Sequence, residues 1–368
     1  SRGSTLMSRK LAFDRILFSI PVILSLFGVV MIYSASAVLS MNRFGSPYHY
    51  LGKQVAALVG GFALMIWAMH FDYRNLRNRW IVLGALMGVV GLLMLALLTP
   101  SGPVRRWISL GFFSFQPSEL AKPVVILFLA SFLDSRAKEI NDWRRTLLPA
   151  GIVVGAIAFL IYLQPDLGTA VSIVLIAGLL LYLAGLKHQY ILSGCALGFV
   201  GLLVMIFQAS YRVQRLMTFL HPSDDPLGAG FQIRQSLLAF GSGGIQGINL
   251  GEGRQKLFFL PEPHTDFIYS VIGEELGFIG TSLVLLVFAI LLWRGLRAAL
   301  RAPDQFGYLL GMGLALFLVI QGALNMGMVL GLLPTKGLPL PFISYGGSSL
   351  MVGLLSVGVL LNISQHSN

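Results

Sequence analysis

The sequence contains few charged residues. Asp, Glu, Lys and Arg make up only 11% of its 368 residues, whereas soluble globular domains carry roughly 25%. Hydrophobic residues make up 56%, and the mean hydropathy is +0.79. With so little charge, most of the surface must be solvated by lipid, and no stretch is polar enough to form a second, soluble domain. We therefore expect an integral membrane protein.

The sequence also lacks the usual signs of disulfides, structural metals and nucleic-acid binding. Its single cysteine, Cys195, lies in an apolar run, and its six His residues are scattered without metal-ligand spacing. The net charge of +11 forms no single basic patch, because the 26 Lys and Arg residues fall between the apolar runs. We interpret them as loop charges that orient the chain and contact anionic lipid headgroups. No nucleic-acid partner is expected.

The apolar runs predict the fold class. Nine runs are long enough to cross a bilayer as helices of about 20 residues. A tenth, 117–133, is short and begins with two ionisable residues, Glu119 and Lys122, although a proline in its first turn is well tolerated. We predict an all-α integral membrane protein with about ten transmembrane helices in one polytopic domain, 7–368, preceded by an expression scar at 1–6. The nine clear runs are 16–38, 55–70, 81–99, 147–163, 169–186, 191–209, 267–293, 306–330 and 344–363.

The distribution of Lys and Arg predicts the orientation, because short cytoplasmic loops carry an excess of these residues. With the N-terminus inside, ten helices place both termini in the cytoplasm. The short external loops then hold five cations: Arg43, Lys53, Arg105, Arg106 and Lys336. The cytoplasmic segments hold fifteen: Arg2, Arg9, Lys10, Arg15, Arg74, Arg77, Arg79, Arg136, Lys138, Arg144, Arg145, Lys187, Arg294, Arg297 and Arg301.

One large extracytoplasmic loop, 210–266, is predicted between the seventh and eighth helices. Loops of such length are mostly functional or disordered. Its glycines between 241 and 253 allow close backbone approach to a ligand but match no phosphate-binding or dinucleotide fingerprint, so plain turns remain an alternative. Apolar residues at helical spacing predict a short amphipathic helix on the outer membrane surface: Phe231, Ile233, Leu237, Leu238 and Phe240. The loop also carries cations that suit either a pyrophosphate or lipid headgroups: Arg212, Arg215, Arg234, Arg254 and Lys256.

Few ionisable residues lie within or beside the apolar runs, and each is a candidate functional group because burying it is costly. Glu119 and Lys122 are three residues apart and can meet on one side of a helix, either as a structural ion pair or as the polar wall of a substrate cavity. Asp166 lies in a tight turn between two spans, where it is either a helix cap or a site residue.

The densest polar cluster closes the long loop at 260–267. Asp266 falls at the predicted start of the eighth helix, where the helix dipole favours the ionised carboxylate and desolvation by lipid opposes it. Such opposing effects hold a carboxylate ready as a general base, although a helix cap or interface anchor is the alternative. Glu274 and Glu275 follow about two helical turns later.

Six motifs occur in order along the chain: RRWISLG at 105–111, QPSELAK at 116–122, QPDLGT at 164–169, PEPHTDFI at 261–268, GEELG at 273–277 and PLPFISYGGSS at 339–349. They resemble those of the shape, elongation, division and sporulation family, the FtsW and RodA proteins of bacteria. The resemblance covers about 14–362, and the residues at 334–337 are more similar to the FtsW branch than to RodA.

The resemblance implies an inverting glycosyltransferase of the bacterial inner membrane. Its expected substrate is lipid II, a disaccharide-pentapeptide on undecaprenyl pyrophosphate, which it polymerises into peptidoglycan glycan strands during division or elongation. In this family the aspartate that corresponds to Asp266 is the proposed catalytic residue. The expected substrate-binding residues are Glu119, Lys122, Asp166, Arg212, Arg215, Arg234, Lys256, His264, Thr265, Lys336 and Ser344.

Cofactor and partners follow from the same resemblance. No all-protein metal cage is evident, so a divalent cation such as Mg²⁺ or Mn²⁺ is expected only if Asp266 holds it together with the substrate diphosphate. The expected partners are a class B penicillin-binding protein with transpeptidase activity, other division or elongation proteins, and membrane lipids. The competing interpretation is a lipid II flippase, because polar cavities within helical bundles also serve transport.

The predicted orientation is testable by cysteine labelling in a Cys195→Ser background. Single cysteines in the loop 210–266 and beside Asp166 should react with a membrane-impermeant thiol reagent in intact cells. Cysteines in 74–79 and 294–301 should react only after the cells are opened. Labelling of 294–301 in intact cells would contradict the orientation.

Overall fold

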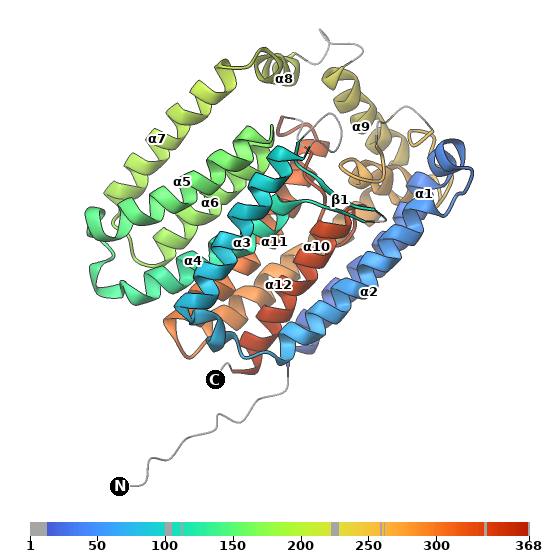
Figure 1. Ribbon diagram of the computed structural model, residues 1–368. Coiled ribbons are helices and arrows are strands. Elements are labelled where there is room, and N and C mark those ends of the chain that lie inside the picture. Colours follow the sequence, from blue (N-terminus) through green and yellow to red (C-terminus); the bar gives the residue numbers. More distant parts are fainter. Residues whose placement is uncertain are drawn as a thin grey trace.

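The computed structural model describes residues 13–99, 105–111, 113–221, 228–257, 260, 262–334 and 337–366, and this part of the chain is almost entirely helical (Figure 1). The all-α prediction is confirmed. The longer helices are α1 (Arg15–Phe44), α2 (His49–His70), α3 (Arg79–Leu98), α4 (Pro117–Ser135), α5 (Leu148–Leu163), α6 (Leu167–Leu183), α7 (His188–Phe207), α8 (Ser210–Leu220), α9 (Ala229–Gly243), α10 (Ile268–Leu300), α11 (Gln305–Val329) and α12 (Gly347–Gln365).

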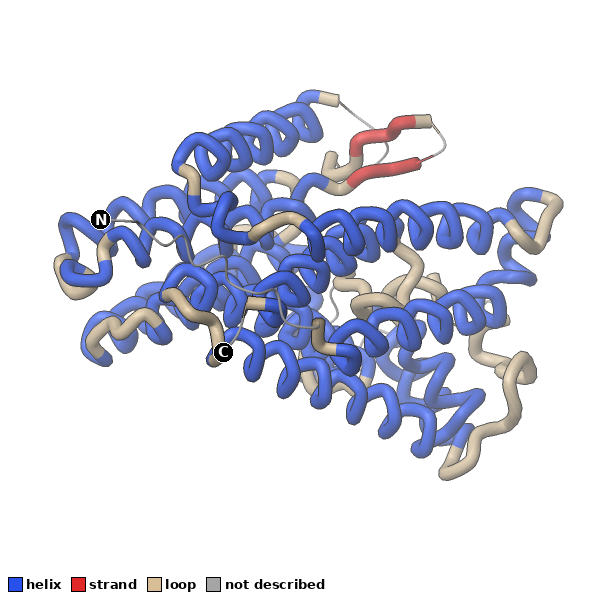
Figure 2. Tube along the Cα trace, turned by 90° about the horizontal axis from the view of Figure 1, so that it is seen from below, coloured by secondary structure: helices blue, strands red, loops and turns tan. Residues whose placement is uncertain are grey.

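Shorter elements connect some of these helices. The single turns are η1 (Tyr73–Arg77), η2 (Ala137–Glu139) and η3 (Trp143–Leu147). Strands β1 (Ile108–Leu110) and β2 (Phe113–Phe115) pair antiparallel, with Ser109 opposite Ser114, and form a hairpin at the edge of the bundle (Figure 2). The sequence analysis did not predict this hairpin, because three-residue strands are too short to show a period.

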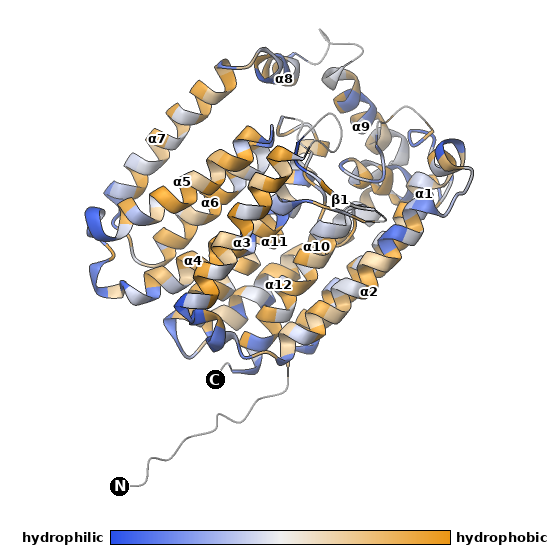
Figure 3. Ribbon diagram, in the orientation of Figure 1, coloured by the Kyte–Doolittle hydropathy of each residue, from blue (hydrophilic) through white to orange (hydrophobic). Residues whose placement is uncertain are grey.

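Eight helices in the described part of the chain are long and apolar enough to cross a membrane. The two others that correspond to predicted spans are α6, which is apolar but shorter, and α4, which carries Glu119 and Lys122 in its first turns. Apolar residues dominate the middle of the bundle, and polar residues gather at its two ends (Figure 3). The count of ten spans stays a prediction.

Helices α11 and α12 form the centre of the molecule. In each, 72% of the most apolar stretch is buried inside the protein, whereas α7 contains no buried residue. Helix α7 stands apart from the bundle (Figure 1). Because it is apolar all around and unpacked on most sides, lipid must cover it.

The start of α1 and the ends of α10 and α12 meet at one end of the bundle. Asp14 caps α1 by accepting hydrogen bonds from the backbone N–H groups of Ile16 and Leu17. Its carboxylate also pairs with Arg294 of α10, and its own N–H donates to the Ser364 hydroxyl at 3.4 Å. Residues 14 and 364 therefore lie on the same side of the bundle, as an even number of spans requires.

Helix α10 is broken at Gly277. This residue has φ 64° and ψ −161°, a backbone conformation outside the helical region. The broken turn is completed by the segment 244–248: the N–H groups of Phe278 and Ile279 donate to the carbonyls of Gly244 and Ile245, and Ile248 N–H donates to the Glu274 carbonyl. At membrane depth such freed backbone groups must be bonded inside the protein. The segment 244–248 of the predicted long loop therefore enters the bundle as part of its fold.

Helix α9 confirms the short helix predicted within the long loop. Its Ile233 and Ser236 are buried, and the Ser236 hydroxyl lies 2.8 Å from the Ser270 hydroxyl of α10. Leu237 and Leu238 are exposed. One side of α9 thus packs on α10, and the position of α9 at the outer membrane surface stays a prediction.

Replacing Gly277 by alanine should destabilise the protein. The positive φ alone costs about 1–3 kcal/mol for a residue with a side chain, and the new Cβ would collide with the backbone of Gly247. The unfolding temperature of purified Gly277→Ala in detergent should fall by several degrees. The matched control is Gly88→Ala in α3, where a Cβ meets nothing within 4 Å and helix propensity favours alanine. Equal stability of the two variants would contradict this account of the break.

Candidate active site

Three consecutive backbone carbonyls before α10 are held by donors from the C-terminal third of the chain. Tyr345 N–H donates to the His264 carbonyl at 2.8 Å, and the Ser344 hydroxyl donates to the Thr265 carbonyl at 2.6 Å. The Asn325 side-chain amide of α11 donates to the Asp266 carbonyl at 2.8 Å. The segment is not helical, so these bonds replace those a helix would supply. They fix the backbone from which the Asp266 side chain projects.

The Asp266 carboxylate itself accepts no hydrogen bond from any described residue. Its side chain keeps some accessible surface but is enclosed by protein on most sides. Burial raises the pKa of Asp266 to about 7, an effect that Arg106 and Arg215 oppose and that Glu262 and Asp166 reinforce. A carboxyl group with a pKa near 7 is half ionised at neutral pH, which suits a general base.

The ring of His264 is locked between two aromatic rings. It is 1% exposed, and its centroid lies 4.3 Å from that of Tyr50 and 5.3 Å from that of Tyr345. Burial lowers the pKa of His264 to about 4, so the ring is neutral at pH 7. Its contact with Glu262 at 3.5 Å is therefore no ion pair at that pH. His264 packs the loop, and the Thr265 hydroxyl does the same by donating to the Glu262 carbonyl at 3.0 Å.

Asp166 is the N-cap of α6. One carboxylate oxygen accepts from the Thr169 N–H at 3.1 Å and the other from the Thr169 hydroxyl at 2.8 Å. The Gln116 amide also donates to Asp166 at 3.2 Å, which ties α6 to the residue before α4. The charge of Asp166 nevertheless acts on Asp266, as the pKa shift shows. Asp166 can therefore cap α6 and at the same time influence the protonation of Asp266.

Glu119 and Lys122 form a buried ion pair, as their spacing predicted. The Lys122 Nζ lies 2.8 Å from the Glu119 Oε1, and each residue is 2% exposed. Lys122 also donates to the Gln321 side chain of α11 at 2.7 Å. Gln321 lies one helical turn before Asn325, so the ion pair is connected through α11 to the loop that carries Asp266.

The expected cations do not all gather near Asp266. Arg215 of α8 lies near Asp266, and so does Arg106. The expected substrate-binding residues did not include Arg106, although it belongs to the motif at 105–111. Arg212 instead donates to the Tyr162 hydroxyl at 2.9 Å and to the Met205 carbonyl at 2.8 Å. Arg234 is exposed on α9. Lys336, like residues 1–6, lies outside the described residues.

Lys256 is already engaged by protein acceptors. Its ammonium group donates to Glu275 Oε1 at 2.5 Å, to the Ser34 hydroxyl at 2.8 Å and to the Gly251 carbonyl at 2.8 Å. All three N–H groups are thus used, and Glu275 is fully buried. Lys256 anchors the loop to α1 and α10, and no N–H group of its ammonium remains for a pyrophosphate. Ser344 is likewise used on backbone groups.

No group of three or more His, Cys, Asp or Glu side chains that could hold a metal occurs among the described residues. A divalent cation held by Asp266 together with the substrate diphosphate needs no such group, so it stays a prediction. The charges that act on Asp266 have both signs: Arg106 and Arg215 are positive, and Glu262 and Asp166 are negative. These arginines can themselves supply the charge expected of a metal.

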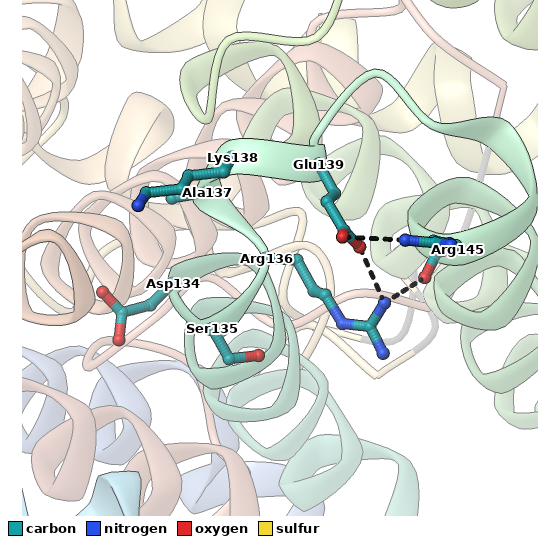
Figure 4. A pocket seen from close by; sticks show the side chains of 7 residues that line it. All are labelled: Asp134, Ser135, Arg136, Ala137, Lys138, Glu139 and Arg145. Atoms are coloured by element: carbon teal, nitrogen blue, oxygen red, sulfur yellow. Dashed lines mark hydrogen bonds and ion pairs between the residues drawn. The ribbon is translucent and has the colours of Figure 1, made fainter.

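A recess of about 750 Å³ lies at the far end of α4 and is lined by both signs of charge. Arg136 and Arg145 both donate to Glu139, at 3.2 and 3.0 Å, and its carboxylate compensates part of their positive charge (Figure 4). Helix α4, which is 19 residues long, lies between this recess and the contact of Gln116 with Asp166. The recess therefore belongs to the end predicted to be cytoplasmic.

Comparison with known proteins settles the family. Residues 14–368 match the sequence profile of the FtsW, RodA and SpoVE proteins, which is described as a family of cell cycle proteins. The chain belongs to this family. The resemblance found in its six motifs is thus confirmed over nearly the whole chain.

Relatives within the FtsW/RodA/SpoVE family are similar over their full lengths. A probable peptidoglycan glycosyltransferase FtsW from Geobacter sp. (strain M18) is 43% identical over 97% of this chain and 98% of its own. Stage V sporulation protein E of Bacillus subtilis (strain 168) is 42% identical over 98% and 99%. These names agree with the division and sporulation branch favoured by the residues at 334–337.

Solved structures of the family share the fold. A chain from a peptidoglycan synthase complex that coordinates polymerization and crosslinking superposes with a TM-score of 0.79, at 31% identity over 96% of this chain and 98% of its own. The rod shape determining protein RodA of Thermus thermophilus has a TM-score of 0.71, at 29% identity over 97% and 99%.

The ion pair of α4 predicts strong coupling between Glu119 and Lys122. Removing one partner of a buried pair leaves an uncompensated charge and costs about 3–5 kcal/mol, whereas removing both is much less costly. Glu119→Gln and Lys122→Met should each lower the unfolding temperature in detergent, and the double variant should lose less than the two effects combined. Strictly additive losses would show that the two charges do not interact.

Proposed function

We propose that this chain is a peptidoglycan glycosyltransferase that polymerises lipid II. The observation that carries the proposal is the Asp266 carboxylate, whose pKa is raised by burial to about 7 while the charges of Arg106 and Arg215 act to lower it. The names of the FtsW relatives support the same activity. The motif that contains Asp266 lies at the predicted outer end of the bundle, where a lipid-linked disaccharide exposed outside the cell would arrive.

The proposed reaction joins two saccharides with inversion. The 4-hydroxyl of the acceptor sugar transfers its proton to Asp266, and the oxygen attacks the anomeric carbon of the donor. A glycosidic bond forms, the bond from that carbon to the pyrophosphate breaks, and undecaprenyl pyrophosphate leaves with the electron pair. Arg106 and Arg215 are placed to stabilise the negative charge that develops on this leaving group.

The ion pair Glu119–Lys122 and the cap at Asp166 complete one polar wall in this proposal. Lys122 keeps one ammonium proton beyond its bonds to Glu119 and Gln321, and the Glu119 Oε2 is buried without a described partner. Both groups are enclosed by protein, so contact with substrate would require the pair to become exposed. Each of its charges is compensated, as burial demands.

A lipid II flippase is not favoured. Alternating-access carriers bind substrate near the bilayer midplane, whereas Asp266 precedes the first residue of α10 and lies at an end of the bundle. The buried ion pair also lies in the first turns of α4 rather than at its middle.

We further propose that the chain works beside a class B penicillin-binding protein in the inner membrane. One similar solved chain comes from a peptidoglycan synthase complex that coordinates polymerization and crosslinking. Coupling of this kind places a transpeptidase where newly made glycan strands emerge.

Asp266→Asn should abolish polymerisation in a folded protein. Loss of a general base lowers the rate by on the order of 10²–10⁴-fold. Purified wild-type and variant proteins, each with its transpeptidase partner, would be supplied with lipid II and the glycan length read on gels. The wild-type rate should rise with pH through about 7, because only the ionised carboxylate accepts the proton.

Thermal stability supplies the control for Asp266→Asn. The folded-state pKa of Asp266 is raised from 3.8 to about 7, so the folded protein binds this proton more tightly than the unfolded chain. The resulting stabilisation is present below about pH 4 and is lost as the pH rises through about 7. Asparagine removes that pH dependence, so the variant should be at least as stable as wild type at pH 8. Near-normal polymer from the stable variant would exclude Asp266 as the base.

A further inference from the structure

Helix α11 presents one buried amide to both loops of the proposed site. Asn325 is fully buried, and its Nδ2 donates one proton to the Asp266 carbonyl at 2.8 Å and the other to the Leu338 carbonyl at 2.7 Å. The two carbonyls belong to segments more than seventy residues apart in the chain. A single planar group therefore sets the distance between them.

The distance between these two loops determines which backbone lies beside the Asp266 carboxylate. Gly337 precedes Leu338, and a Cβ built on Gly337 would lie 3.2 Å from the Asp266 Oδ2. The backbone at Gly337 is thus one wall beside the carboxylate. Since no described residue donates a hydrogen bond to this carboxylate, its orientation depends on the backbone that carries it and on this wall.

Holding the two loops through the Asn325 side chain has a cost in folding free energy. Its Oδ1 is buried and has no hydrogen-bond partner among the described residues. An unsatisfied buried acceptor opposes stability, so the stability of the fold alone does not explain an amide at this position. The placement of both N–H groups does.

We propose that Asn325 is a positioning residue that holds Asp266 and the Gly337 wall in register for glycan polymerisation, an inference that rests on the function proposed above. Asn325 acts through Asp266 and need not contact substrate. Its loss should lower kcat, because the base moves relative to the acceptor hydroxyl, while the affinity for lipid II is retained.

The chain offers a matched control at the other end of the bundle. Asn362 of α12 is also fully buried, and its amide donates to the Met69 carbonyl at 2.8 Å while its Oδ1 accepts from Tyr73 N–H at 2.9 Å. Asn362→Leu therefore removes hydrogen bonds of the same side-chain-to-backbone type, far from Asp266. It measures the effect of a general loss of stability.

The experiment compares Asn325→Leu, Asn362→Leu and Asp266→Asn with wild type in the lipid II polymerisation assay, each with the transpeptidase partner and at a temperature where all are folded. We expect kcat of Asn325→Leu to fall by about 10- to 100-fold, the loss typical of a misplaced catalytic group, with KM within about threefold of wild type. Asn362→Leu should keep the wild-type kcat. Wild-type kcat for Asn325→Leu, or equal losses for both asparagine variants, would overturn the inference.

A second variant decides the matter if Asn325→Leu does not fold. Gly337 is exposed, so Gly337→Ala should fold normally while its methyl group, 3.2 Å from the Asp266 Oδ2, displaces the carboxylate by a few tenths of an ångström. We expect its kcat to fall at unchanged KM, and an unchanged kcat would overturn the inference. Polymer from wild type but not from Asp266→Asn would keep the proposed function whatever the asparagine result. No polymer from wild type would overturn both.

Discussion

The need to bond every backbone polar group inside the membrane governs this structure. Most of the chain meets it with helices, but the residues before α10 do not. The carbonyls of His264, Thr265 and Asp266 are held instead by Tyr345, Ser344 and Asn325. The interruption of α10 at Gly277 is likewise completed by the backbone at 244–248. Both departures from helix are completed by other segments of the chain, and the first carries Asp266. The irregular backbone is thus tolerated only where other parts of the chain enclose and bond it.

Because little water reaches the interior of the bundle, buried charged side chains also need partners within the protein. Lys256 with Glu275 and Lys122 with Glu119 are buried pairs, each tied to a further helix by an extra hydrogen bond. Asp266 differs, because Arg106 and Arg215 act on it without a hydrogen bond. A paired carboxylate is a structural anchor, whereas an unpaired carboxylate with a raised pKa can exchange a proton at neutral pH. This contrast separates Asp266 from the other buried acids and supports its assignment as the base.

Local patterns in the sequence predicted much of the site, and nonlocal packing explains what they missed. The spacing of Glu119 and Lys122 predicted their contact, because three residues of helix fix it. The position of Asp266 before an apolar run predicted that desolvation would act to raise its pKa against the helix dipole, and burial does raise it. Arg106 was omitted, because the irregular segment before β1 gives no sign of which distant carboxylate it approaches. Asn325 was missed altogether, because one amide in an apolar helix carries no pattern.

The sequence by itself determined the class of the protein, since composition, apolar run length and helical spacing are local properties that lipid and the α-helix period translate directly into structure. It also determined the family, because six motifs occur in order. Tertiary structure alone decided which cations remain available near Asp266: Lys256 is used by Glu275, and Arg212 by Tyr162, while Arg215 approaches the site. It alone brought Asn325 to the Asp266 carbonyl. Such choices depend on which helices pack together, and the hydrogen-bond partner of a buried polar group is set by that packing and not by its neighbours in the chain.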